Sequence, residues 1–333
     1  MAIGETAYVN GVREQLLAGR ARLAEVLADG ERAHVNQLLN EVDQALQRIE
    51  AGTFGICEEC HTEIGEEWLR ENPLTTVCLE HMTAKQRSAL EYDLEVAAQL
   101  QKGLLPPSET NFENWQVAHY FQPASVVSGD YCDVIRENGH LYFIMADVSG
   151  KGVAAAMLAS NLRAVFRSLI PLGLSIEEFL VRANRLFRES ALPSQYATTV
   201  FGRTSKDGEL ELMNLGHPPV LLATDGEVRR FESMCHPLGF FTDDTVCVTK
   251  AQMSPGDTLL LYTDGISEAA NERDEEYGVD AVAQLLQEQS LRNPHTLVSS
   301  VKRDLAAFRG RAERLDDETL LAIQYSPAAS SRA

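Results

Sequence analysis

Apolar residues follow two different patterns along the chain, and the change comes near Pro107. From about Val12 to Ile49 they recur every three or four residues, with a break at Asp29-Gly30, which predicts two helices joined by a turn. A third helix is predicted from about Ala84 to Leu104, because Pro106-Pro107 ends the pattern there. The N-terminal part is therefore expected to be mainly helical.

After Pro107 the apolar residues form short runs that are separated by turn signals. These runs predict strands that start near Trp115, Tyr131, His140, Ala197, Glu209, Pro219, Thr245, Asp257 and Glu318. Helical patterns interrupt them at 152–170, 175–190, 278–289 and 294–308. Strands in consecutive groups, with helices in pairs, favour an α+β fold with antiparallel sheets covered by helices over a doubly wound parallel sheet.

The length and composition indicate a globular protein with more than one domain. At 333 residues, with 44% hydrophobic and 23% charged residues, the chain can bury a sizeable core and suggests two domains, one of them small. No apolar run reaches the roughly 18 residues of a membrane span, and the first residues lack the features of a signal peptide. We therefore expect a cytoplasmic protein without membrane contact, and a disordered tail at 327–333.

The charge argues against nucleic-acid binding. The formal net charge is −20, and no basic patch offsets its repulsion of nucleic-acid phosphates. Residues 1–82 alone contain six Lys/Arg and fifteen Asp/Glu. DNA binding by this segment is therefore not expected.

The cysteines fall into a cluster and a scattered set. Cys132, Cys235 and Cys247 lie among apolar residues and read as buried thiols, so no disulfide framework is expected. The cluster follows the pattern C-x-x-C, seventeen residues, then C-x-x-H, and consists of Cys57, Cys60, Cys78 and His81. Zinc takes four such ligands in a tetrahedron, so one structural zinc is predicted. His61 competes for the fourth position, but it adjoins Cys60 and its geometry is poorer.

Four aspartates stand where a predicted strand meets a turn, namely Asp130, Asp147, Asp264 and Asp316. Any one of them could be an ordinary turn residue. Four at strand ends fit a site for Mg²⁺ or Mn²⁺ instead, because these hard ions prefer oxygen ligands and strand ends hold short side chains rigidly.

The sequence around these aspartates resembles a known superfamily. SVVSGDYCDV, FIMADVSGKGVAAAMLAS, MNLGHPPVLL, LLLYTDGISEAAN and LDDETLLAI occur in the order of the signature blocks of PPM phosphatases, in the SpoIIE/RsbU-like branch. The resemblance covers about residues 90–326. It implies a β-sandwich of two antiparallel sheets flanked by helix pairs, and metal-dependent hydrolysis of phosphoserine and phosphothreonine in proteins.

The resemblance also implies roles for the aspartates at a centre of two Mn²⁺ or Mg²⁺ ions. Asp130 would bridge the ions. Asp147 and the backbone carbonyl of Val148 would hold one ion, and Asp264 and Asp316 would complete the other. Two cations can neutralise a phosphate ester and activate a water, so no side-chain nucleophile is required.

Several neighbours of these aspartates have open roles. Asp133 is expected to contact metal-bound water and Asp317 to orient the loop, although both could be solvated turn acids. Lys151 could attract a phosphate or stay solvated, and His217 is expected to be structural. Ser128 stands where the branch commonly has a glycine.

The stretch 34–82 resembles the DksA/TraR zinc-finger family, with His81 in place of the usual fourth cysteine. Members can bind RNA polymerase through the acidic tip of a helical hairpin, and Asp29 and Glu31 lie near the tip here. A structural or sensory module is expected. The predicted domains are therefore 1–83 for the zinc-finger module, 84–107 for a linker helix and 108–326 for the phosphatase.

The linker helix carries an apolar stripe at Leu90, Leu94, Ala97, Ala98 and Leu104. It resembles the linker of this phosphatase branch, which can form a homodimer and pass a signal to the metal site, but a core helix would show the same stripe. The resemblance thus implies a phosphatase whose substrate is a STAS-like anti-sigma-factor antagonist in a partner-switching pathway, with another phosphoprotein as the first alternative substrate. The alternative is a transcription protein that binds RNA polymerase and uses a phosphatase-like scaffold.

Overall fold

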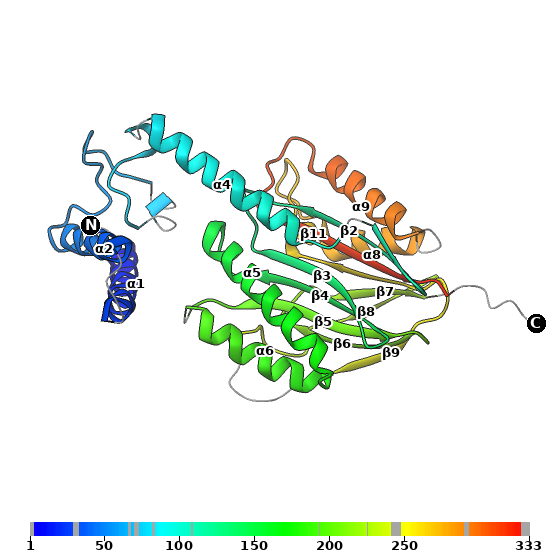
Figure 1. Cartoon of the computed structure of the whole chain (residues 1–333). Coiled ribbons are helices and arrows are strands. Elements are labelled where there is room, and N and C mark those ends of the chain that lie inside the picture. The colour runs from blue at the N-terminus through cyan, green and yellow to red at the C-terminus, as the bar shows by residue number, and fades with distance from the viewer. Residues whose placement is uncertain are drawn as a thin grey trace, which may run out of the picture. The chain divides into compact units, whose positions relative to one another are not determined.

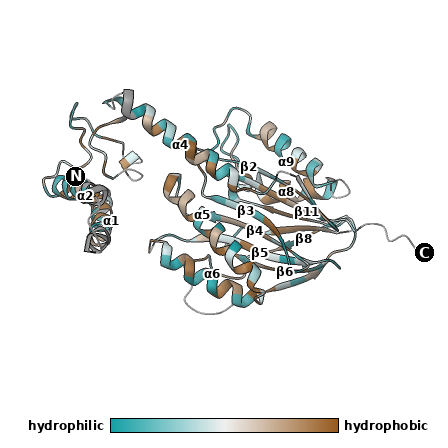
Figure 2. Ribbon diagram, viewed as in Figure 1, coloured by the Kyte–Doolittle hydropathy of each residue, from teal (hydrophilic) through white to brown (hydrophobic). Residues whose placement is uncertain are grey.

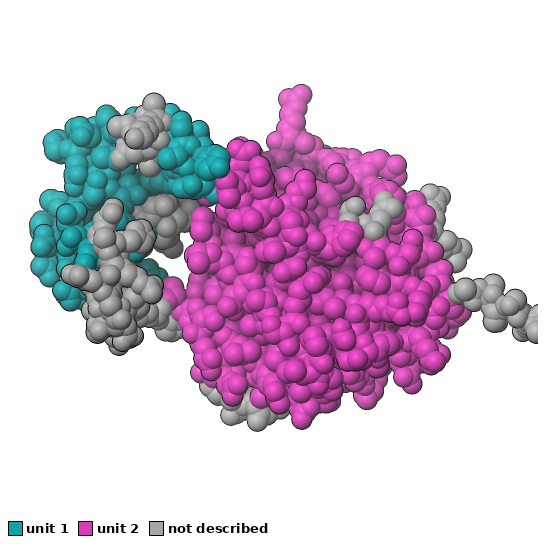
Figure 3. Space-filling model, in the orientation of Figure 1, with its two compact units in different colours: residues 1–93 teal, residues 94–333 magenta. Residues whose placement is uncertain are grey.

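The computed structural model describes residues 3–28, 33–65, 68–69, 73–81, 84–107, 109–192, 194–224, 226–240, 248–289 and 293–327. The helices are α1 (Ile3–Ala28), α2 (Ala33–Glu50), η1 (Leu79–His81), α4 (Ala84–Leu104), α5 (Gly152–Leu169), η2 (Ile170–Leu172), α6 (Ile176–Ser190), α7 (Asp264–Ser267), α8 (Gly278–Gln289) and α9 (Pro294–Arg309) (Figure 1). The strands are β1 (Glu109–Phe112), β2 (Trp115–Gln122), β3 (Asp130–Glu137), β4 (His140–Val148), β5 (Ala197–Ser205), β6 (Glu209–Leu215), β7 (Val220–Thr224), β8 (Glu227–Phe231), β9 (Thr249–Gln252), β10 (Thr258–Tyr262) and β11 (Glu318–Tyr325). The chain divides into two compact units, Met1–Asp93 and Leu94–Ala333, which Figure 3 shows in different colours.

The first unit is built on the predicted helix pair. Apolar residues that recur at helical spacing meet across α1 and α2, and the buried ones are Val12, Leu16, Val42 and Ala45. A second small core forms under the loops that follow α2, around Cys57, Ile64 and Leu69. Arg48 in the last turn of α2 joins the two parts, since its guanidinium donates to the carbonyls of Ile56 and Thr75 at 2.5 and 3.2 Å. The predicted tip, with Asp29 and Glu31, lies outside the described residues.

The second unit is a sandwich of two antiparallel sheets. One sheet has six strands in the order β1-β2-β11-β10-β7-β8, and the other has five in the order β3-β4-β5-β6-β9. Helices α5 and α6 cover the five-stranded sheet, and α8 and α9 cover the six-stranded one (Figure 1). This arrangement confirms the predicted α+β fold.

The strands of the sandwich are apolar on both faces because both faces are covered. In β4, Phe143 and Met145 point into the core between the sheets, whereas Tyr142 and Ile144 point toward the helices. Figure 2 shows hydrophobic residues gathered along these strands. Burial on both sides explains why the strands appear in the sequence as nearly continuous apolar runs.

Helix α5 is a core helix. The stretch Gly152–Leu172 is long and apolar enough to cross a membrane by length and composition, and half of it is buried. Its buried side, which includes Leu158, Leu162 and Phe166, packs in the core shared with α6 and the five-stranded sheet. Its apolar character is therefore explained by the packing of the sandwich.

Two strands were not predicted, and one is displaced. β1 and β8 are the edge strands of the six-stranded sheet and are rich in polar or charged residues, as edge strands commonly are. β9 begins at Thr249, later than the predicted start at Thr245. Residues 241–247, with Cys247, and the tail from 328 lie outside the described part of the chain.

Candidate metal centres

The four aspartates predicted as metal ligands lie at strand ends on one end of the sandwich. Asp130 starts β3 and is the direct antiparallel partner of Asp147, which stands next to the end of β4. Asp264 follows β10, and Asp316 precedes β11, the strand paired with β10. The Thr263 hydroxyl donates to Asp130 Oδ2 at 2.9 Å, so the ends of the two sheets meet here.

Asp130 is the most enclosed of these carboxylates. Its side chain is 3% exposed, and Oδ2 accepts hydrogen bonds from the hydroxyls of Thr263 and Thr319. Burial and the nearby charges of Asp147 and Asp317 raise its pKa well above the usual value, although the two hydroxyls oppose this. The protein thus holds a carboxylate where its negative charge is poorly compensated.

The other three carboxylates add to the same negative cluster. Burial, followed by the charges of Asp264 and Asp316, raises the pKa of Asp147 to about 7. Burial and Asp316 also raise the pKa of Asp264. Lys151 opposes both shifts, and its Nζ lies 3.4 Å from Asp316 Oδ2. One exposed lysine does not balance four carboxylates, so the residues fit divalent cations, which would offset the mutual repulsion.

Two glycines let the loops of this site come close together. A β-carbon at Gly129 would lie 2.9 Å from the carbonyl oxygen of Val148 and 3.8 Å from Asp147 Oδ1. A β-carbon at Gly265 would lie 2.0 Å from the carbonyl oxygen of Asp317. The glycines of the SGD and TDG motifs therefore keep the Val148 carbonyl and the Asp316-Asp317 loop beside the aspartates.

Asp317 orients a loop, as predicted. Its carboxylate accepts from the backbone N–H groups of Ala124 and Gly129 at 2.8 and 2.9 Å, and from the Ser128 hydroxyl at 2.6 Å. These bonds fix the segment that leads into Asp130. Lys151 has a similar role on the other side, since its Nζ donates to the carbonyl of Leu315 at 2.7 Å.

The expectation for Asp133 was wrong. Three residues after Asp130, this side chain points to the opposite face of β3, where it is fully buried. Its carboxylate accepts from Arg167 at 2.7 and 3.0 Å and from the Tyr131 hydroxyl at 2.9 Å. Asp133 therefore anchors α5 to β3 and makes no contact with the aspartate cluster.

His217 is structural, as predicted. It is 3% exposed, and its Nδ1 lies 2.8 Å from the hydroxyl of Thr198. Burial lowers its pKa to about 3, so the ring stays neutral. Cys132 is likewise fully buried, in the core between the sheets.

Two hydroxyl residues at the site were not predicted. Thr263 and Thr319 stand next to predicted residues, in YTDG and DDET, yet each one's role depends on donating to Asp130 across the sandwich. The sequence signal that could have identified these two threonines was their position within the motifs.

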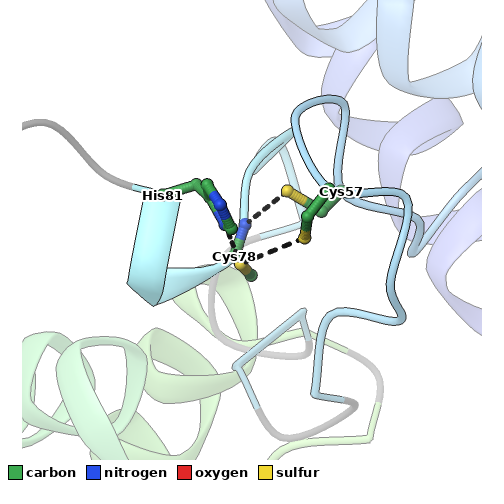
Figure 4. Close-up of side chains that lie close together, drawn as sticks. Cys57, Cys78 and His81 are labelled. Atoms are coloured by element: carbon green, nitrogen blue, oxygen red, sulfur yellow. Dashed lines mark hydrogen bonds between the residues drawn. The ribbon is translucent and has the colours of Figure 1, made fainter.

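The cysteine cluster forms a second candidate metal site, in the first unit. Donor atoms from Cys57, Cys60, Cys78 and His81 all lie within 4.8 Å of one another. Cys78 Sγ is 3.8 Å from Cys60 Sγ. It lies 3.0 Å from His81 Nδ1, as Figure 4 shows for these two labelled residues. Three sulfurs and one imidazole nitrogen at this spacing fit a tetrahedral zinc ion.

His81, and not His61, lies with the three cysteines in this cluster. His81 ends the short helix η1, which starts one residue after Cys78. His61 has a left-handed backbone, with φ of 56°, and its N–H donates to the Cys57 carbonyl at 2.9 Å. His61 therefore makes a tight turn behind Cys60 and stays outside the cluster.

Cys57 is suited to be a thiolate. Burial raises its pKa, but hydrogen bonds from the backbone N–H groups of Cys60, Cys78 and Glu59 outweigh this and bring the pKa to about 6. The Cys78 N–H lies 3.3 Å from Cys57 Sγ (Figure 4). Metal ligation requires the deprotonated thiol, so these donors favour it.

Two family models match the chain. The model of stage II sporulation protein E (SpoIIE) matches residues 137–326, and the model of the prokaryotic dksA/traR C4-type zinc finger matches residues 52–80. The zinc-finger match ends one residue before His81, the candidate ligand that departs from a C4 pattern.

Two individual proteins match more than half of the chain. Protein IcfG of Synechocystis is 26% identical over 261 residues, which are 69% of this chain and 41% of that protein. Phosphoserine phosphatase RsbU of Bacillus subtilis is 25% identical over 197 residues, 58% of this chain and 59% of that protein. This chain thus spans well under two thirds of either relative. The solved PP2C domain of SiaA from Pseudomonas aeruginosa matches 74% of this chain and all of its own, with a TM-score of 0.65 and 21% identity, which shows the fold.

Proposed function

Since this chain belongs to the SpoIIE family and its second unit has the PPM phosphatase fold, we propose that it is a metal-dependent protein serine/threonine phosphatase. The observation that carries the proposal is the group of mutually repelling aspartates at one end of the sandwich, in which Asp130 is buried and Asp316 is exposed. Such a cluster is costly to fold unless cations bind to it.

We propose the ligands that the resemblance implies. Asp130, Asp147, the Val148 carbonyl, Asp264 and Asp316 would hold two Mn²⁺ or Mg²⁺ ions. When bound, the ions supply charge neutralisation of the phosphate and activation of water. Thr263 and Thr319 orient the Asp130 carboxylate, and Asp317 and Lys151 hold the adjacent loops. Separately, Cys57, Cys60, Cys78 and His81 would hold one structural zinc.

The substrate in this proposal is a phosphorylated protein. A cavity of about 180 Å³, lined by Asp264, Asp316 and Arg309 among others, opens beside the aspartates. It is smaller than typical small-molecule pockets and suits a single side chain presented by a protein. The likeness to phosphoserine phosphatase RsbU supports a STAS-like anti-sigma-factor antagonist in a partner-switching pathway as that protein.

The proposal extends to the organisation of the chain. The zinc-finger module is assigned to 1–83, the linker helix to 84–107 and the phosphatase domain to 108–326, with a homodimer formed through α4. A cytoplasmic location is consistent with the absence of a disulfide at four of the described cysteines, Cys57, Cys60, Cys78 and Cys132.

A second candidate is a transcription protein that binds RNA polymerase. One observation favours it: a segment of the chain is 37% identical over 51 residues to the RNA polymerase-binding transcription factor DksA of Caulobacter vibrioides, although this covers 15% of the chain. Co-sedimentation with purified RNA polymerase separates the candidates, since the phosphatase proposal requires no such complex.

The proposed activity is tested with the full chain and a phosphoserine-bearing STAS protein, with an aryl phosphate as second substrate. We expect phosphate release that requires Mn²⁺ or Mg²⁺ and stops with chelator. Release that continues unchanged in excess chelator, after dialysis, would contradict the metal-dependent mechanism.

A further inference from the structure

The last turn of α4 makes an unusual attachment to the loop before β3. Gln101 Nε2 donates to the carbonyl of Ser128 at 2.7 Å, and the Ser128 N–H donates to Gln101 Oε1 at 2.9 Å. One side-chain amide thus satisfies both backbone groups of a single residue, as a neighbouring strand would. Two bonds at fixed spacing set both the distance and the orientation of the loop relative to the helix.

Ser128 connects Gln101 to Asp130 and Asp317 through its hydroxyl. Its side chain is fully buried, and its hydroxyl donates to Asp317 Oδ2 at 2.6 Å and accepts from the N–H of Asp130 at 2.9 Å. A glycine here would keep the two bonds to Gln101 but would lose the hydroxyl. The serine therefore connects Gln101, Asp130 and Asp317 through continuous hydrogen bonds.

The end of α4 is itself held in place by α5. Arg163 of α5 donates from Nε to the carbonyl of Leu104 at 2.9 Å. Gln101, Leu104 and Arg163 line one small cavity together with Asp130. The position of Gln101 is thus fixed relative to both α5 and the candidate metal ligand.

We propose that Gln101 is a positioning residue for the metal centre, acting through Ser128 on Asp130. Both polar atoms of the Gln101 side chain bond the backbone of Ser128, so its proposed effect on the metal is indirect. A shift or rotation of the end of α4 would move the Ser128 backbone and, with it, the carboxylate of Asp130. The inference rests on the proposed function only in taking Asp130 as a ligand of the catalytic metal.

The test compares near-isosteric variants of two glutamines in the full chain. Gln101→Met keeps the length of the side chain and removes both hydrogen bonds. Gln99→Met is the matched control, because Gln99 is exposed on the same helix and its amide donates to Glu95 Oε1 at 3.5 Å. We expect Gln101→Met to weaken Mn²⁺ binding, measured by calorimetry, by about tenfold, the scale set by losing a hydrogen-bonded pair.

Two further readouts separate positioning from general destabilisation. At saturating Mn²⁺ the KM for an aryl phosphate should match wild type, and the Mn²⁺ concentration for half-maximal rate should rise with the dissociation constant. Ser128→Ala keeps both amide bonds and removes the hydroxyl, so it should weaken Mn²⁺ binding too. The double variant should lose less than the two single losses combined, because both act through one link.

The outcomes are distinct. Equal Mn²⁺ binding by wild type, Gln101→Met and Ser128→Ala would overturn this proposal and leave the phosphatase assignment intact. A wild-type protein that binds no Mn²⁺ would instead overturn the proposed function. If Gln101→Met does not fold, unchanged Mn²⁺ binding by Ser128→Ala still contradicts the link, and weakened binding supports it.

Discussion

At the scale of single residues, His217 provides a test of how tightly the sandwich is packed near the aspartates. Burial lowers its pKa to about 3 from 6.5, so between these values the unfolded chain binds a proton that the folded chain does not. The free energy of unfolding must therefore fall as the pH falls below 6.5. We expect this residue to cost about 1 kcal/mol for each pH unit below the unfolded pKa.

Urea unfolding of wild type and His217→Gln at two pH values measures this effect. We choose pH 7.5 and pH 5.5, because each lies roughly one unit from the ordinary histidine pKa. The loss of stability between the two conditions should be smaller by about 1 kcal/mol in the variant. Equal losses would mean that folding does not lower the pKa of His217.

Residue types at strand ends predicted the candidate ligands, but not the groups that hold them. Asp130 and Asp264 could be identified because each ends or starts an apolar run next to a glycine. Thr319 and Gln101 could not, because their partners come from segments far away in the sequence. Asp133 was misassigned because alternation along β3 turns it to the face opposite Asp130.

At the scale of elements, the helices and most strands were predictable, but the two edge strands of the six-stranded sheet were not. Burial on both faces gives β4 and β11 continuous apolar runs, whereas β1 and β8 carry polar residues at the edges of their sheet. Among the described side chains of α4, residues 87–104, none is fully buried. This favours the linker interpretation of its stripe over that of a core helix.

The stripe on α4 leads to a prediction about assembly. Leu94→Glu places a charge in the proposed seam and should shift the protein from dimer to monomer, with an altered phosphatase rate. Tyr92→Glu is the matched control, because Tyr92 is 66% exposed and lies off the stripe. Sedimentation velocity distinguishes these outcomes, and a wild type that is monomeric at high concentration would exclude the dimer.

At the scale of the whole molecule, the chain has two candidate metal sites with different donor atoms. Thiolates in the first unit select zinc, and carboxylates in the second select Mg²⁺ or Mn²⁺. Zinc binding can supply roughly 10 kcal/mol to the folding of a small module. Cys60→Ser should therefore make residues 53–82 sensitive to protease while the second unit stays folded.

Elemental analysis of protein purified without added metal checks this division. We expect about one zinc per chain in wild type and in Asp130→Ala. Cys60→Ser and Cys78→Ser should lose it. Loss of zinc in Asp130→Ala would place the ion in the second unit and contradict the assignment to the cysteine cluster.

The central claim is that the aspartates at the end of the sandwich form a catalytic metal centre. Its most direct test is the rate of phosphate release from a phosphoserine protein at saturating Mn²⁺, compared between wild type, Asp130→Ala and Asp264→Ala. Asp207→Ala is the control, because Asp207 lies exposed in the turn between β5 and β6. We predict that both ligand variants remain folded and lose at least about a hundredfold in rate, while Asp207→Ala matches wild type. Undiminished turnover in either ligand variant would contradict the assignment.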